Sequence, residues 1–380
     1  PPGPWRIYGL TTSPSEHPDP LSSEIAEVGI ERFLQALPDL PFRSLVATVD
    51  HPPADWSPTF AAGFQRLQGY DLREQLPSLF GDASDGNADR VQHDYLAARA
   101  ELCREAMAVW ATQSRLAFRR TRMLDRTNHA HPLDSLSVPE VPGIVPGPLL
   151  TPENLPLFRF AASAAHLNSR PLVAARVEAM DWEQVPRTPR EIKRQLDLAF
   201  LAGANFVSLD TGLSRGAPLA GIWRDVNQLC HYITRCQMIL QAGAPDPDLL
   251  LYYPAPDFWS DRGGIPSDKT EQMRWLRPTG FLDTARRLDE HGITYDIVSD
   301  RLLEKASVMD GHLVLGGLHY KGIVLPEVRR FPESSATHLL DLARKGAKVG
   351  IVGDWPLDVP GLPMPDVRRG TLFTSMQAIP

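Results

Sequence analysis

Acidic residues stand at the ends of several apolar runs in this sequence. Glu178 follows the run 172–177, and Asp50 and Asp210 follow similar runs. Such runs are typical of strands that are buried on both faces of a parallel sheet. The carboxyl ends of parallel strands meet at one rim, and α/β folds place their chemistry there. The sequence therefore predicts a rim that is lined with carboxylates.

Aromatic rings follow two of these acids. Asp181 and Trp182 come soon after Glu178, and Trp56 comes soon after Asp50. Acids with a nearby indole are typical of a sugar site, because two carboxyls can cleave a glycosidic bond while a ring stacks on the sugar. Glu178 could instead cap its loop or pair with an arginine, and Asp50 could orient loop amides.

Histidines form a third group of candidates. His51 follows Asp50 directly, and Asp125 is followed by His129 and His131. The two loop histidines alternate and lack a clear third ligand, so their pattern does not favour a metal site. The three cysteines have neither the spacing of a metal site nor that of a disulfide framework, and we interpret them as buried thiols.

Composition and charge narrow the classes of partner. The chain has 380 residues, of which 22% are charged and 43% hydrophobic, so it can bury a full core. The net charge of −7 disfavours a nucleic-acid or anionic-membrane partner, and no apolar run is long enough to span a bilayer. The chain begins with Pro-Pro-Gly-Pro, which is typical of a trimmed start and predicts no compartment.

Strands and helices alternate over residues 1–243. The predicted strands are 5–10, 44–50, 116–124, 135–141, 172–177 and 205–210. The predicted helices include 22–37, 88–113, 152–167, 189–202 and 222–241. This alternation predicts a (β/α)8-type barrel. A closed barrel has eight strands, so we expect two further strands upstream of residue 1.

The pattern changes after residue 243. Predicted strands at 249–253, 295–298, 313–315, 320–325 and 347–353 surround predicted helices at 280–291 and 333–345. This pattern predicts a smaller doubly wound α/β domain over 244–360, followed by a C-terminal tail over 361–380. Neither a GxGxxG motif nor a P-loop supports nucleotide binding.

Short motifs in a fixed order resemble one glycosidase family. They lie at 56–60, 69–72, 76–80, 90–95, 161–167, 235–237, 253–254, 295–299 and 324–326. Together they resemble the α-L-rhamnosidase family, glycoside hydrolase family 106, over about residues 20–355. The resemblance implies a barrel followed by a glutamine-amidotransferase-like domain of flavodoxin type. Members are large, calcium-dependent inverting hydrolases, so this chain would correspond to the middle of one.

The resemblance implies roles for the candidate residues. Glu178 would be the general base, and Asp50 or Asp125 the acid, in the inverting hydrolysis of a terminal α-L-rhamnose or a related deoxysugar. The predicted substrate contacts are His51, Trp56, Tyr70, Asp181, Trp182, Asp210 and His129. No metal ligand is predicted, although calcium carries over with the resemblance.

Two positions depart from the pattern of the family. Asp50-His51-Pro52 stands where the family carries Asp-Glu-Pro, and Arg119-Arg120-Thr121-Arg122 stands where it carries Gly-Gln or Gly-His. Losing one acid of the pair lowers the rate by orders of magnitude. The alternative prediction is therefore a catalytically lapsed carbohydrate-binding paralogue that keeps the cleft. A third reading uses the histidine as the base of another reaction on a glycosylated substrate.

For several candidates, a purely structural role is an alternative hypothesis. Trp56 and Tyr70 could pack helices against the barrel instead of stacking on a sugar. Asp210 could pair with an arginine such as Arg215 on the following loop.

Overall fold

The computed structural model describes residues 19, 21–36, 44–49, 56–80, 87–117, 120–125, 131–144, 151–152, 155–179, 187–210, 223–261 and 280–379. The strand predicted at 5–10 and the candidates Asp50, His51, His129, Asp181 and Trp182 lie outside these residues.

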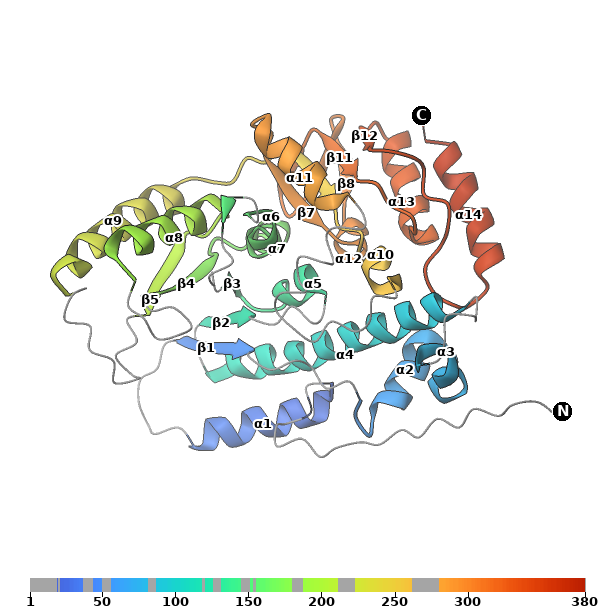
Figure 1. Ribbon diagram of the computed structural model, residues 1–380, viewed down its shortest axis with the longest axis horizontal. Coiled ribbons are helices and arrows are strands. Elements are labelled where there is room, and N and C mark those ends of the chain that lie inside the picture. Colours follow the sequence, from blue (N-terminus) through green and yellow to red (C-terminus); the bar gives the residue numbers. More distant parts are fainter. Residues whose placement is uncertain are drawn as a thin grey trace.

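The first sheet contains parallel strands that pair in chain order (Figure 1). They are β1 (Ser44–Val49), β2 (Arg120–Asp125), β3 (Val141–Ile144), β4 (Ala174–Glu178) and β5 (Phe206–Asp210). Parallel strands that pair in chain order and alternate with helices are the arrangement of a β/α barrel. Within the described residues the sheet stays open, because β5 does not pair with β1. An eight-stranded barrel therefore stays a prediction.

The two faces of this sheet differ in character. On β4, Ala175 and Val177 join the main hydrophobic core beneath the helices. Arg176 and Glu178 alternate with them, so these side chains lie on the other face, where both are half-buried. Polar chemistry on β4 is thus confined to the face that points away from the main core.

The helices of this part of the chain precede or follow its strands. They are α1 (Ser23–Ala36), α2 (Phe60–Gln68), the 3-10 helix η1 (Leu72–Gln75), α3 (Leu76–Phe80), α4 (Ala88–Ala117), α5 (Pro132–Leu136), α6 (Leu155–Phe158), α7 (Phe160–Leu167), α8 (Pro189–Leu201) and α9 (Trp223–Ala242). No helix in the described part of the chain is long and apolar enough to span a membrane.

A second parallel sheet follows, with the order β12-β11-β6-β7. Its strands are β6 (Leu249–Tyr252), β7 (Tyr295–Val298), β11 (Gly322–Leu325) and β12 (Val349–Ile351), and β8 (Ser307–Met309), β9 (His312–Leu315) and β10 (Leu318–Tyr320) form a small antiparallel sheet. The helices are α10 (Ala255–Ser260), α11 (Phe281–Glu290), α12 (Asp300–Leu303), α13 (Glu333–Arg344) and α14 (Pro365–Gln377). Because the chain extends from β6 in both directions, the order is that of a doubly wound sheet. Its glutamine-amidotransferase type stays a prediction.

Helix α7 lies between the two sheets (Figure 1) and contacts both β3 and β7. Asp296 on β7 is buried and accepts a hydrogen bond of 3.0 Å from Ser163 Oγ on α7, while His166 Nδ1 lies 2.9 Å from the same carboxylate oxygen. One hydrophobic core contains buried residues from both sheets. The boundary at 243/244 stays a prediction, and the core crosses it.

Several local expectations differ from the structure. Of the cysteines predicted to be buried, Cys103 is buried, Cys236 is half-buried and Cys230 is exposed. The strand predicted at 135–141 is wrong, because helix α5 ends at Leu136 and strand β3 begins only at Val141. His131 caps this helix by accepting the Asp134 N–H, and Pro132 occupies its first turn, where proline is favoured. The helix predicted at 152–167 is divided into α6 and α7, and the predicted C-terminal tail contains α14.

Candidate active site

The carboxyl ends of β4 and β5 place two acids side by side. Glu178 and Asp210 are register partners on these neighbouring parallel strands. Both side chains are half-buried, and both follow residues that alternate into the core. They therefore share the face of the sheet opposite the core, at its carboxyl edge, as the sequence predicts for an α/β site.

Asp210 is already paired with a cation. Arg176 on β4 forms an ion pair with it, and the two side chains are 28% and 20% exposed. The alternative partner weighed above, Arg215, lies outside the described residues. The charge of Asp210 is thus matched by a residue two positions before Glu178, on the same face of β4.

The backbone register places β2 at the same edge. Asp125 pairs with Val49 on β1 and with Ile144 on β3, and Ile144 pairs with Ala175. Glu178 follows Ala175 by three residues, or about 10 Å along the strand direction. The ends of β1, β2 and β4 therefore lie at one edge, with Glu178 extending beyond the other two. The roles of Asp50 and Asp125 as the acid stay predictions.

Trp56 and Tyr70 belong to a separate hydrophobic cluster around α2 and α4. The Trp56 ring lies 5.4 Å from that of Phe60, and the Tyr70 ring meets Phe64 edge-on at 5.1 Å. The Tyr70 hydroxyl donates to Asp94 Oδ2 at 3.0 Å. Burial and the neighbouring Asp94 carboxylate raise the pKa of Tyr70. These contacts agree with the hypothesis that Trp56 and Tyr70 pack helices together. Contact of either ring with a substrate stays a prediction.

His131 is engaged in packing. It is buried, caps α5, and meets the rings of Tyr253 and Trp259 edge-on at 5.3 and 5.7 Å. Burial lowers its pKa and so favours the neutral ring. Among the described residues, no group of three or more His, Cys, Asp or Glu side chains could hold a metal ion.

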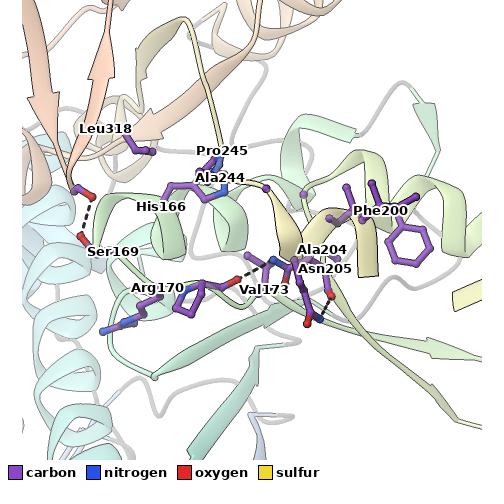
Figure 2. Close-up of a pocket in the computed structure, with 17 residues that line it drawn as sticks. His166, Ser169, Arg170, Val173, Phe200, Ala204, Asn205, Ala244, Pro245 and Leu318 are labelled. Carbon is purple, nitrogen blue, oxygen red and sulfur yellow. Dashed lines mark hydrogen bonds between the residues drawn. The ribbon is translucent and has the colours of Figure 1, made fainter. Parts of the chain in front are cut away.

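A cavity of about 510 Å³ opens at the opposite edge of the first sheet (Figure 2). It is lined by Val173 and Asn205, which precede β4 and β5, and by His166 and Pro245. The Asn205 amide is used internally, since it accepts from Val173 N and donates to Pro171 O, both at 2.8 Å. Glu178 lies five residues beyond Val173, or about 16 Å along the strand. The cavity is thus remote from the rim that carries the acids.

Arg176 is the residue at the rim whose role the sequence did not indicate. It interrupts the apolar run before Glu178, which is a signal in itself, because a buried strand rarely carries an unpaired charge. Its spacing of two from Glu178 predicts a shared face. The identity of its partner depends on the register of β5 and could not be read from the chain.

The comparisons with known proteins agree with this architecture. The sequence model of the α-L-rhamnosidase family matches residues 48–375. A protein of Formosa agariphila named putative beta-glucuronidase is 24% identical over 95% of this chain and 32% of its own length. The structure of a rhamnosidase from Novosphingobium sp. PP1Y is 20% identical, with a TM-score of 0.69, over 95% of this chain and 36% of that one.

More distant structures share the fold alone. A beta-galactosidase from Bacillus circulans sp. alkalophilus is 10% identical, with a TM-score of 0.57, over 87% of this chain and 53% of that one. The chain spans about a third of the length of the first two relatives. Since the family model covers most of the residues, the chain belongs to the α-L-rhamnosidase family, glycoside hydrolase family 106.

Proposed function

We propose that this chain provides the catalytic part of a glycoside hydrolase that removes a terminal α-L-rhamnose, or a related deoxysugar, with inversion. One observation carries the proposal: Glu178 stands at the carboxyl edge of β4, on the face opposite the core, beside a carboxylate whose charge Arg176 already matches. Membership in the α-L-rhamnosidase family supports rhamnose as the sugar that is released. The proposed substrate is a small carbohydrate or glycoside.

The chemistry follows the two-carboxylate scheme. Glu178 acts as the general base and takes a proton from a water molecule, whose oxygen forms a bond to the anomeric carbon. Asp50 or Asp125 acts as the general acid and protonates the glycosidic oxygen as its bond to that carbon breaks. Because water enters opposite the leaving group, the two carboxyls must stand about 6.5–9.5 Å apart. The product is the free sugar with inverted anomeric configuration.

The remaining candidates are proposed to hold the sugar. Among these candidates, Asp210 lies at the rim in the described part of the chain, and it accepts hydrogen bonds from sugar hydroxyls. Aromatic and polar contacts are assigned to His51, Trp56, Tyr70, His129, Asp181 and Trp182. Every step of the scheme uses side chains of this chain, and no step passes through calcium.

The experiment is hydrolysis of p-nitrophenyl α-L-rhamnopyranoside by the unaltered chain and by Glu178→Gln, with and without added calcium. We expect Glu178→Gln to lower kcat about 10²- to 10⁴-fold, because the amide cannot accept the proton of the water. Glu290→Gln, on the exposed end of α11, is the matched control and should keep full activity. Undiminished hydrolysis by Glu178→Gln would contradict the proposal.

The same assay distinguishes the two candidate acids. Asp50→Asn and Asp125→Asn are compared, and the variant with the larger loss identifies the acid. Saturable binding of the rhamnoside without turnover by the unaltered chain would instead support the lapsed carbohydrate-binding protein.

A further inference from the structure

The cavity of about 510 Å³ at the opposite edge of the first sheet has a mostly apolar wall (Figure 2). It lies where α7, α8 and α9 end, before β4 and β5 begin, and beside the turn between β9 and β10. Its large apolar side chains include Val173, Phe200, Ile239, Leu240 and Leu318. Ile239 and Leu240 are 75% and 42% exposed, so the wall keeps apolar surface in water that a ligand could cover. A wall of this character around a space of this size is typical of a site for a small organic molecule.

Several polar side chains of this wall already have partners within the protein. The Ser169 hydroxyl and the Gln241 amide each donate to a backbone carbonyl, at 2.7 and 2.6 Å. The Arg170 guanidinium donates to two backbone carbonyls of the segment before β3, and Figure 2 shows this side chain extending away from Val173 and Asn205. Since the guanidinium charge is already surrounded by acceptors, the wall favours a ligand without charge.

A network of hydrogen bonds fixes the ring of His166. Its Nδ1 lies 2.9 Å from Asp296 Oδ1, and the Asp296 carboxylate also accepts from the Ser163 and Tyr320 hydroxyls, both at 3.0 Å. Ser163 Oγ itself accepts the Ile297 N–H at 2.8 Å, so its hydrogen is directed to Asp296. Because a carboxylate only accepts, Nδ1 of His166 is the donor in this contact. The network therefore sets both the orientation of the ring and the position of one of its hydrogens.

The second ring nitrogen of His166 remains for a ligand. His166 lines both the 510 Å³ cavity and a smaller one of about 210 Å³, whereas Asp296 lines only the smaller of the two. The Nδ1 edge of the ring thus faces the smaller cavity. Nε2 forms no hydrogen bond with any residue that the structure describes, and the side chain is 21% exposed. Nε2 accepts in the neutral ring and donates in the protonated ring, and a hydroxyl group is complementary to both forms.

We propose that this cavity binds a small neutral molecule with an apolar ring system and one hydroxyl group, of the chemical class of the phenols. The ring system covers the apolar wall beside Ile239 and Leu240, and the hydroxyl forms a hydrogen bond with Nε2 of His166. The cavity is remote from the rim that carries Glu178, so it is a second site. The inference goes beyond the proposed function and does not rest on it.

The test uses equilibrium dialysis at neutral pH with 2-naphthol and with 2-methylnaphthalene, which has nearly the same shape but lacks the hydroxyl. We expect saturable binding of one 2-naphthol per chain. His166→Asn keeps an amide N–H near the position of Nδ1 for Asp296 and removes Nε2. It should bind 2-naphthol about 2- to 10-fold more weakly, as expected for one lost hydrogen bond, and 2-methylnaphthalene as before. The difference between the two ligands is the coupling of a double-mutant cycle.

A second pair of variants tests whether the ligand lies in the cavity. Leu240→Asp places a charge on the apolar wall and should weaken the binding of both ligands more than about 10-fold. Met238→Asp is the matched control. Met238 is 68% exposed on the same helix and lies outside the cavity lining, so this variant should bind both ligands normally.

The outcomes separate this inference from the proposed function. Absence of saturable 2-naphthol binding to the unaltered chain overturns the inference and leaves the proposed hydrolysis untouched. Unchanged binding by Leu240→Asp overturns it, because the ligand then lies elsewhere. Equal effects of His166→Asn on the two ligands overturn it as well, because the ring then does not recognise the hydroxyl. If His166→Asn does not fold, the proton resonances of the His166 ring in the unaltered chain decide: 2-naphthol should shift them more than 2-methylnaphthalene does, and equal shifts overturn the inference.

Discussion

Two aspartates on helices α10 and α12, Asp257 and Asp300, have pKa values above that of an exposed aspartate. Burial is the main cause, and it raises the pKa of Asp257 and of Asp300 to about 6. Asp257 accepts the N–H groups of Arg329 and Arg330, both at 2.8 Å. Asp300 accepts from Ser335 Oγ at 2.6 Å and from the Tyr252 hydroxyl at 3.0 Å. These hydrogen bonds favour the charged form but do not outweigh desolvation.

The pKa of Asp300 predicts a pH dependence of stability. In the unfolded chain an aspartate ionises near 3.9, whereas in the folded chain Asp300 ionises near 6. Between these values the folded state holds a proton that the unfolded state lacks, so the contribution of Asp300 to stability falls as pH rises through this window. Asp300→Asn removes the dependence. We expect the free-energy difference between the two proteins to move in favour of the variant by about 2–3 kcal/mol from pH 4 to pH 7.

Urea unfolding at several pH values measures this difference. Asp283→Asn, on the exposed side of α11, controls for the loss of a carboxylate. A difference that stays constant across the window would show that Asp300 keeps an ordinary pKa in the folded protein.

At the scale of residues, the sequence predicted positions better than partners. It placed Glu178 and Asp210 at strand ends, and the structure makes them register partners. It could not predict that Arg176 would pair with Asp210, or that the Tyr70 hydroxyl would bind Asp94. Such pairings depend on strand register and helix packing over tens of residues, and no local pattern in the chain specifies them.

At the scale of elements, helix α8 shows which local signals can be read from a sequence. Thr188 and Pro189 predicted its start, and the structure contains a full capping box. Thr188 Oγ1 accepts the Glu191 N–H at 3.3 Å, and the Glu191 carboxylate accepts the Thr188 N–H at 2.7 Å. The box satisfies two N–H groups that would otherwise lack partners at the first turn. A signal that is complete within four residues needs no tertiary contact to be read.

The prediction of a strand at 135–141 was wrong because the local pattern there is ambiguous. The short apolar run there fits either a strand or a helix, and run length alone does not decide between them. His131 as the cap and Pro132 in the first turn decide for helix α5. Strand β2 begins at Arg120, later than predicted, and α4 extends through Ala117.

The capping box of α8 predicts a measurable cost. Thr188→Ala removes the acceptor of the Glu191 N–H, and we expect the free energy of unfolding to fall by about 1 kcal/mol. Thr371→Ala is the control, because its hydroxyl donates to the Val367 carbonyl within α14, where it lies inside the helix and is not its N-cap. Equal stability of the two variants in urea unfolding would show that the box contributes nothing beyond helix propensity.

At the scale of the whole molecule, the two sheets are joined by more than the shared core. Helix α4 contacts β2 and also α10 of the second half. Arg90 on α4 donates to Val359 O at 2.6 Å and to Gly361 O at 3.0 Å, and it forms an ion pair of 2.6 Å with Asp358. Asp94, one turn further along, accepts the Leu362 N–H at 2.9 Å. Residues 358–362 are thereby held against a helix more than 240 positions earlier in the chain.

This connection predicts that the chain unfolds as one cooperative unit. Arg90 is buried, and its removal leaves the carbonyls of Val359 and Gly361 without their donor, while Asp358 keeps Arg330 and Arg369 as partners. Leaving buried acceptors without a donor costs about 1–3 kcal/mol. Arg90→Met should therefore lower the stability of both sheets together. Far-UV circular dichroism and tryptophan fluorescence, followed during urea unfolding, should give coincident transitions for the unaltered chain and for the variant, with the transition of the variant at a lower urea concentration.

Arg73→Met, which breaks an exposed pair with Asp71 before α3, should change the transition little, because exposed ion pairs contribute about 0–1 kcal/mol. If only part of the signal moved in Arg90→Met, the two sheets would be independent units, and the rim at β4 would not depend on the second sheet for its position.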